Sequence, residues 1–156
     1  MKFKVKTAVP QPLVKVWQKF DDQLLQQLTP PYPILRLLRY EGNHTGDLII
    51  LELDFVLFKQ RWKSQVVNFK LDNQYIAFTD QGIQLPFFLS TWQHTHQLEQ
   101  TSKQHTIITD EVEYHTPMLV LDYLLYPLLF CLFLYRRPIY KRIFADKVKT
   151  QNLTGQ

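Results

Sequence analysis

Two histidines separated by one residue lie in TWQHTHQLEQ, residues 91–100, a stretch in which polar and apolar residues alternate. Side chains in a β-strand point to opposite faces in turn, which would place on one face Trp92, His94, His96 and Leu98. Because that face carries an indole and a leucine, we expect it to point inward, with both imidazoles beside an apolar space. Imidazole exchanges protons near neutral pH and also ligates metals, so this segment is the first candidate for chemistry.

The next strand supplies a carboxylate that these histidines could use. In HTIITDEVEYHT, residues 105–116, alternation places on one face Ile108, Asp110, Val112 and Tyr114. Asp110 is therefore a candidate hydrogen-bond partner for His94 or His96, and the pairing register decides which. His44, His105 and His115 are expected in turns or facing outward.

Three interpretations of His94, His96 and Asp110 stay open. They could form a satisfied polar network that fixes the strands, because an unpaired buried charge is costly. They could orient the polar end of a mostly apolar ligand. A histidine could also act as general acid or base, with Asp110 setting its tautomer. His-x-His supplies only two metal ligands, so we predict no metal site and no cofactor.

Composition predicts one globular domain with a substantial core. Of the 156 residues, 46% are hydrophobic and 14% aromatic, and the net charge is +4. Lysine and arginine do not gather beside stacking aromatics, so no nucleic-acid partner is expected. The only cysteine, Cys131, excludes an internal disulfide, and its apolar neighbours predict core packing. No phosphate-binding glycine loop, nucleophile elbow or metalloprotease helix occurs.

The stretch YLLYPLLFCLFLYRR, residues 123–137, is apolar on every side and could be a membrane span or a core helix. A bilayer crossing needs about 20 apolar residues, and Asp122 and Pro127 interrupt the run here. The strand-rich segment before it also needs a cover for its apolar face. We therefore predict a core helix that begins near residue 119 and lies across a sheet.

The elements before this helix predict an antiparallel meander. Alternation indicates a strand over 2–9, helical spacing indicates two short helices over 13–28, and six strands follow up to residue 116. The strand LIILELDFVLF is expected to run to a turn at 59–60, and QGIQLP, residues 81–86, to form a loop. The fully apolar face of LIILELDFVLF should line a cavity through Ile49, Leu51, Leu53, Phe55 and Leu57.

This order of elements resembles the helix-grip fold of the SRPBCC superfamily, which includes START lipid-transfer domains, polyketide cyclases and aromatases. The segments LTPPYP (28–33), DQGIQLPF (80–87) and WQHTHQLEQ (92–100) are similar to those of a bacterial ligand-binding subgroup. The resemblance implies an α+β domain over residues 1–147, with a flexible tail over 148–156. It also implies a curved seven-stranded sheet and a long C-terminal helix that covers a cavity for an apolar molecule.

We therefore predict a soluble, cytoplasmic carrier or sensor of a small hydrophobic molecule. The predicted ligand-binding residues are Leu51, Leu53, Phe55, Trp92, His94, His96, Asp110, Tyr114, Tyr126 and Phe130. An alternative is a polyketide cyclase- or dehydratase-like enzyme that uses His94, His96 and Asp110 as acid and base. A third is a structural or membrane-peripheral protein whose basic C-terminal end contacts anionic lipid. The sequence predicts neither the ligand nor the oligomeric state.

Overall fold

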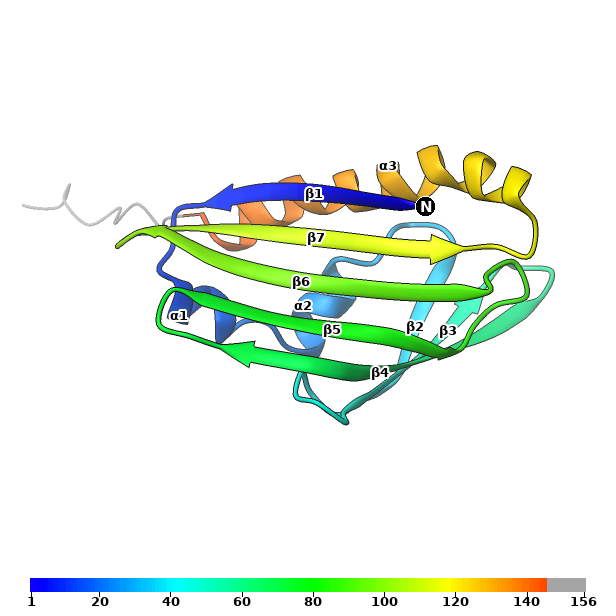
Figure 1. Cartoon of the computed structure of the whole chain (residues 1–156), viewed down its shortest axis with the longest axis horizontal. Coiled ribbons are helices and arrows are strands. Elements are labelled where there is room, and N and C mark those ends of the chain that lie inside the picture. Colours follow the sequence, from blue (N-terminus) through cyan, green and yellow to red (C-terminus); the bar gives the residue numbers. More distant parts are fainter. Residues whose placement is uncertain (146–156) are drawn as a thin grey trace, which may run out of the picture.

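A computed structural model describes residues 1–145, which form a curled seven-stranded antiparallel sheet and three helices (Figure 1). In chain order the elements are β1 (Lys2–Val9), α1 (Leu13–Trp17), α2 (Asp22–Gln27), β2 (Ile34–Tyr40), β3 (Leu48–Asp54), β4 (Lys59–Leu71), β5 (Tyr75–Gln84), β6 (Thr91–Ser102), β7 (His105–His115) and α3 (Leu119–Ile143). The predicted order of elements is confirmed. The predicted tail, 148–156, lies outside the described residues.

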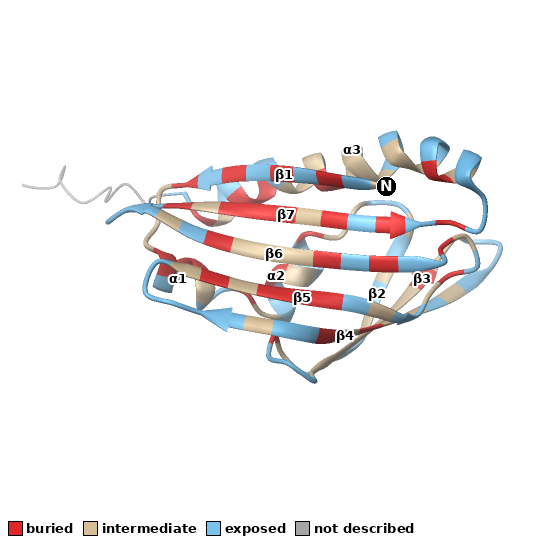
Figure 2. Cartoon of the chain, viewed as in Figure 1, coloured by how far each residue is buried: buried red, intermediate tan, exposed pale blue. Residues whose placement is uncertain are grey.

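The strand order β1-β7-β6-β5-β4-β3-β2 is that of a meander with the first strand added beside the last. Burial alternates along β1 as the sequence predicts, with its lysines outside and its apolar residues inside (Figure 2). The outer face of the β1–β7 pair carries ion pairs: the Nζ atoms of Lys2 and Lys4 lie 2.6 Å and 2.7 Å from the two carboxylate oxygens of Glu111. These contacts favour the observed register.

The turn between β3 and β4 comes earlier than predicted. The Asp54 carboxylate accepts a hydrogen bond from the Val56 amide at 2.9 Å, and Val56 has a φ of 71°. A local side-chain acceptor thus ends the strand, although the residues that follow favour strands. Leu57 lies in this turn and is 91% exposed, so its predicted place in the cavity wall is wrong.

The loop predicted over residues 81–86 begins later than predicted, because its first four residues belong to β5. β5 continues to Gln84, and Gly82 pairs with Ser64 of β4 within the ladder. The register shifts on either side of this pair show that an irregular ladder accommodates the Gly-containing segment.

The two short helices close one end of the sheet. Asp21 caps α2, because its Oδ1 accepts the Leu24 amide proton at 2.9 Å. Apolar side chains of this helical segment then join the core cluster at that end, which includes Leu13, Val16, Phe20, Leu24, Leu28, Tyr140 and Phe144.

α3 lies over the sheet and is fixed at both ends. At its start, the Asp122 carboxylate accepts the Thr116 amide proton at 2.6 Å, and the Asp122 carbonyl accepts the Tyr114 hydroxyl proton at 2.6 Å. At its end, Tyr140 is buried in the core. The prediction that this helix covers the sheet is confirmed.

The outer face of α3 differs from the prediction of a core helix. Only Asp122, Phe133, Ile139 and Tyr140 are buried within the helix. A set of apolar side chains is exposed on this face instead: Leu119, Val120, Tyr123, Leu124 and Tyr135. Cys131 is also exposed, which contradicts its predicted core packing. The sheet covers one side of α3 and leaves the other side exposed. By length and composition alone, this helix is also apolar enough to cross a membrane.

We predict that Asp122→Asn lowers the melting temperature at pH 7. Burial alone would raise the pKa of Asp122, but hydrogen bonds from Thr116 hold this pKa below its ordinary value. The carboxylate therefore stabilises the fold above the pKa it has when unfolded, and this contribution disappears as pH falls. The difference between variant and wild type should shrink from pH 7 toward pH 3 in thermal melts. Glu99→Gln, at an exposed carboxylate on β6, is the control, and an unchanged Asp122→Asn at pH 7 would contradict the prediction.

Candidate functional site

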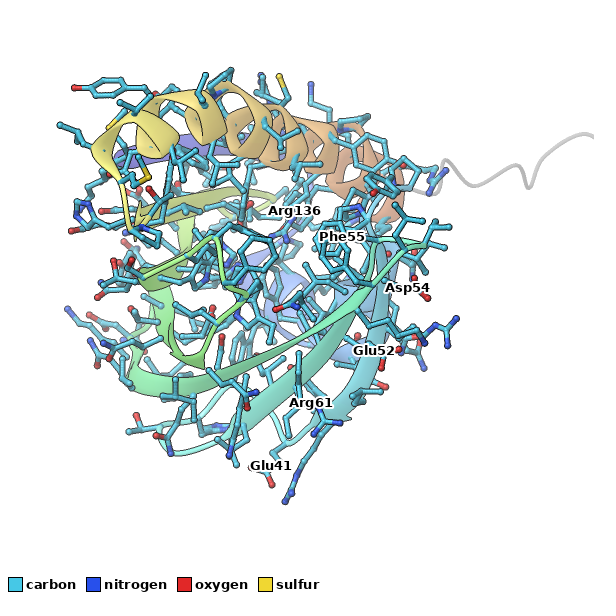
Figure 3. All side chains as sticks on the ribbon, turned by 90° about the vertical axis from the view of Figure 1, so that its right-hand side faces the viewer. Glu41, Glu52, Asp54, Phe55, Arg61 and Arg136 are labelled. Atoms are coloured by element: carbon cyan, nitrogen blue, oxygen red, sulfur yellow. The ribbon has the colours of Figure 1, made fainter. Side chains whose placement is uncertain are left out.

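A cavity of about 360 Å³ lies between the sheet and α3. Its wall is mainly apolar and includes Leu35, Ile49, Leu51, Leu53 and Phe55 from the sheet side and Leu125, Leu128, Leu129, Leu132 and Phe133 from α3. Figure 3 shows Phe55 and Arg136 in the space beneath α3, while Glu41, Glu52 and Arg61 lie on the outside of the sheet. This volume falls in the range of small-molecule sites.

Four polar side chains from three adjacent strands meet at one part of this cavity. Asp80 on β5 pairs across the ladder with His94 on β6, and His96 pairs with Asp110 on β7. Because residues two apart share a face, all four side chains lie on the inner side of the sheet. Arg136 of α3 approaches from the opposite wall.

His94 lies between two carboxylates. Its Nε2 is 3.0 Å from Asp110 Oδ1 in a hydrogen bond, and its Nδ1 is 3.6 Å from Asp80 Oδ2. His96 Nδ1 is 3.1 Å from the same Asp110 oxygen, but without the geometry of a hydrogen bond. Asp110 is thus the carboxylate that both histidines approach.

Arg136 adds the positive charge of this group. One terminal nitrogen of its guanidinium is 3.7 Å from Asp110 Oδ1, and the group lies over the Phe133 ring at 4.2 Å from the centroid. Its side chain is only 15% exposed, and it lines the cavity. A guanidinium in this position neutralises Asp110 and also presents donors to anything that enters the cavity.

Burial separates the protonation states of these groups. Burial lowers the pKa of His94 to about 3, with a further contribution from His96, so His94 is neutral at pH 7. Burial alone would raise the pKa of Asp110, but hydrogen bonds, first of all that from His94, hold this pKa below its ordinary value. Asp110 is therefore a carboxylate, His94 donates its Nε2 proton to it, and His94 Nδ1 is left as an acceptor.

Asp80 behaves differently because burial dominates. Burial raises the pKa of Asp80 to about 6, against weaker opposing effects led by His96. Asp80 lines the cavity directly, whereas Asp110 does not. Among the described residues around this cavity, Asp80 is therefore the carboxylate that a bound molecule would meet.

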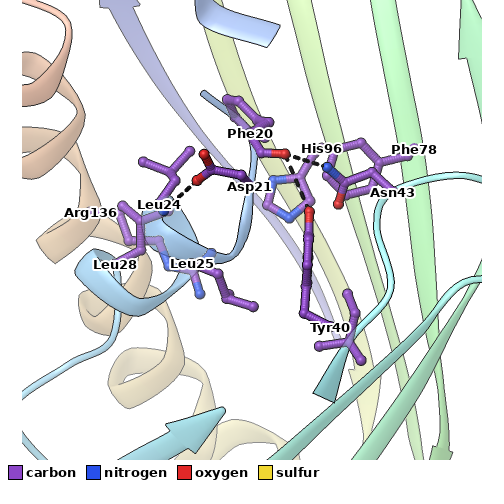
Figure 4. A pocket seen from close by; sticks show the side chains of 11 residues that line it. Phe20, Asp21, Leu24, Leu25, Leu28, Tyr40, Asn43, Phe78, His96 and Arg136 are labelled. Carbon is purple, nitrogen blue, oxygen red and sulfur yellow. Dashed lines mark hydrogen bonds between the residues drawn. The ribbon is translucent and has the colours of Figure 1, made fainter. Parts of the chain in front are cut away.

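A smaller hollow of about 40 Å³ lies beside His96 and Arg136 (Figure 4). Next to it, the Phe20 carbonyl accepts hydrogen bonds from Asn43 Nδ2 at 2.6 Å and from the Tyr40 hydroxyl at 3.3 Å. This hollow has room for a water molecule but not for an organic ligand.

The structure divides the predicted site residues into two sets. The cavity wall includes Leu51, Leu53, Phe55, Trp92, His94 and His96. Asp110 lies behind the histidines, 1% exposed, and Tyr114 is fully buried with its hydroxyl bound to α3. Tyr126 and Phe130 pack against Phe3 of β1. These four residues are placed outside the wall, because a strand or helix face shared in sequence also includes positions beyond the cavity.

Sequence reasoning missed Asp80 and Arg136. Asp80 shares a face with Ile76 and Phe78 of β5, so the alternation that revealed His94 could have revealed it too. Arg136 lies where the basic C-terminal end of the chain begins, but its spacing from Leu129 and Leu132 places it on the cavity side.

Solved structures of known proteins share this architecture. The Zhui aromatase/cyclase from Streptomyces sp. R1128 matches with a TM-score of 0.70 over 99% of both chains at 12% identity. Norcoclaurine synthase from Thalictrum flavum, in complex with dopamine and hydroxybenzaldehyde, matches with a TM-score of 0.66 at 18% identity, over 96% of this chain and 89% of that one. The chain has the helix-grip fold.

A third helix-grip structure, XoxI from Bacillus cereus, matches with a TM-score of 0.64 at 16% identity, over 93% of this chain and 96% of that one. The resemblance to SRPBCC proteins is therefore confirmed at the level of the fold. No family model and no curated protein sequence matches the chain. Because these identities are low, the similarity shows the fold and leaves the activity open.

We predict that Asp110→Ala destabilises this helix-grip domain by about 3 kcal/mol in urea denaturation, because it leaves Arg136 and His94 buried without their acceptor. Asp110→Asn should recover part of the loss, since an amide oxygen still accepts the His94 proton. Glu113→Ala, at an outward-facing and half-exposed position of the same strand, is the matched control. Equal effects of Asp110→Ala and Glu113→Ala would show that the buried network contributes little.

Proposed function

We propose that the chain is a binding protein, a carrier or sensor, for a small and mainly hydrophobic molecule held between the sheet and α3. The observation that supports it is the cavity of about 360 Å³, which has an apolar wall and a compact polar group. A site with few, clustered polar groups binds apolar molecules and fixes their orientation.

The apolar wall would supply the main driving force. A ligand that buries roughly 300 Å² of apolar surface gains about 7 kcal/mol, before the cost of lost motion is subtracted. The polar end of the ligand would contact Asp80, His94 or Arg136, all of which line the cavity. A molecule without any polar group would leave these side chains desolvated and without compensation, so an amphipathic ligand fits best.

Filling the cavity should abolish binding. We predict that Leu51→Trp weakens binding of a polarity-sensitive dye such as 1-anilinonaphthalene-8-sulfonate at least tenfold in fluorescence titration, because the indole occupies the ligand volume. Leu57→Trp adds the same side chain at the exposed β3–β4 turn and should leave dye affinity unchanged. Native mass spectrometry of the purified wild type should also show a co-purified small molecule that Leu51→Trp lacks.

Thermal melts establish that both variants fold before the dye titrations are compared. Dye affinity that is unchanged in a folded Leu51→Trp variant would argue against the cavity as the binding site.

Acid–base catalysis of the cyclase or dehydratase kind remains an alternative. His94 and His96 line the cavity, whereas Asp110 contacts His94 from behind and would act by positioning it. In a carrier, His96→Phe should spare or strengthen binding of an apolar molecule, because it replaces a polar ring with an apolar one. In an enzyme, the same change should abolish turnover while binding persists.

A second proposed role is attachment to an anionic membrane surface through α3. The exposed apolar face of this helix is followed by the exposed cations Arg137, Lys141 and Arg142. An apolar helix face combined with basic residues suits the interface of an anionic bilayer. The helix would lie on the surface and keep its inner side over the cavity.

We predict that the protein sediments with vesicles that contain phosphatidylserine, and less as salt rises, because salt screens surface attraction. Leu124→Glu should reduce sedimentation severalfold, because it places a carboxylate on the membrane-facing side. Val14→Glu changes an equally exposed apolar residue on α1 and is the control. Equal effects of the two variants would contradict docking through α3, and loss of a dimer in gel filtration on Leu124→Glu would instead assign this face to a second copy.

A further inference from the structure

We propose that Asp80, His94 and His96 form a binding site for one divalent transition-metal ion inside the cavity. The site goes beyond the proposed binding of a hydrophobic molecule and does not depend on it. Sequence reasoning predicted no metal, because it found only the two histidines; the third ligand is Asp80, which the fold places across the ladder from His94.

The three side chains offer ligand atoms around one point. One carboxylate oxygen and one nitrogen from each imidazole all lie within 4.8 Å of one another. Asp80 Oδ2 and His94 Nδ1 are 3.6 Å apart, close to the roughly 3.3 Å that separates two ligands bound tetrahedrally at about 2.0 Å from zinc. The rings of His94 and His96 lie with their centroids 3.9 Å apart, so a small movement of the side chains closes the set.

The hydrogen bonds of His94 give it the tautomer that a metal ligand needs. Its Nε2 is 3.0 Å from the carboxylate of Asp110, which can only accept, so the proton is on Nε2. The lone pair of Nδ1 is then free on the side that faces Asp80. A ligating histidine commonly donates its other N–H to a carboxylate in this way, which fixes the ring and raises its basicity.

His96 provides a second, independent observation. Its Nδ1 is buried and lies 3.1 Å from Asp110 Oδ1, but this contact lacks the geometry of a hydrogen bond, so the atom has no hydrogen-bond partner within residues 1–145. A buried polar atom without a partner is costly, and such an atom beside two other ligand groups indicates a missing partner. Rotation of the His96 ring toward Asp80 and His94 would turn this unsatisfied group into a ligand.

The charges in this region also favour a cation. Two buried carboxylates, Asp80 and Asp110, face a single guanidinium, and Arg136 is paired with Asp110. Asp80 Oδ2 lies 3.6 Å from His94 Nδ1, and Arg136 forms its ion pair with Asp110 rather than with Asp80. A divalent ion at Asp80 would compensate the charge of this carboxylate, and the low polarity of the cavity strengthens the attraction between the two.

The donor set determines the kind of ion. Two imidazole nitrogens and one carboxylate oxygen suit zinc, cobalt or iron(II), whereas magnesium and calcium prefer oxygen ligands. Three protein ligands on one side of the ion leave its other positions directed at the cavity, as in open rather than closed metal sites. A donor atom of a molecule in the cavity could complete the coordination.

The test is titration of the chelator-treated full-length chain with Co²⁺, followed by visible absorption and by equilibrium dialysis. We expect one equivalent with micromolar or tighter affinity and the d–d bands of a low-coordinate site. Asp80→Asn and His96→Gln should each weaken this affinity at least tenfold, because each removes one ligand. Saturating Zn²⁺ should raise the melting temperature of the wild type and not that of Asp80→Asn.

Surface histidines are excluded with a triple variant, His44→Gln with His105→Gln and His115→Gln, which changes three exposed side chains and should bind Co²⁺ as the wild type does. No saturable Co²⁺ binding by the wild type would overturn the proposal, whether or not the variants fold. Binding that Asp80→Asn and His96→Gln leave unchanged would overturn it as well. The hydrophobic dye is not part of this titration, so its result is separable from that for Leu51→Trp.

Discussion

The structure depends on the hydrogen-bonded corner at which β7 passes into α3. The Asp122 carboxylate accepts the Thr116 amide proton, and its carbonyl accepts the Tyr114 hydroxyl proton. Aromatic packing of Tyr140 and Phe144 holds the other end. Between these two attachments the helix spans the curled sheet, and the leucines that it directs inward do not fill the space. The cavity is thus a consequence of how α3 is held at its ends.

The polar group in this cavity follows from the meander. Neighbouring strands bring Asp80, His94, His96 and Asp110 to one face with no crossover connection, so the group is built on rigid backbone rather than on loops. Both carboxylates are buried, but hydrogen bonds hold the pKa of Asp110 below its ordinary value, whereas burial dominates at Asp80 and raises its pKa. Asp80 and the two histidines line the cavity together with Arg136 and can meet an incoming molecule, whereas Asp110 does not line it.

The sequence predicted the parts of this arrangement that depend on local periodicity. Alternation assigned the inner faces of β6 and β7, and these two faces predicted that Asp110 approaches His94 or His96 without deciding between them. It did not predict the turn at residues 55–58, because apolar residues that favour strands form it and the Asp54 carboxylate stabilises it. Nor did it show that Tyr126 and Phe130 pack on Phe3, since the sequence does not give the angle at which a helix crosses a sheet. The exposed outer face of α3 was missed for a related reason: an all-apolar helix carries no signal for which side is covered.

The pairing of β1 with β7 has a consequence for how the chain reaches this fold. β1 lies near the start of the described residues and pairs with β7 near their end, so closing the sheet joins segments of high sequence separation, which slows folding. β1 is an edge strand in the finished sheet as well, and the alternating Lys2, Lys4 and Lys6 are the type of residue that keeps such an edge from pairing with another chain. The charges of Lys2 and Lys4 thus have two effects: they hold β1 to β7 through Glu111, and they disfavour the addition of a further strand to β1.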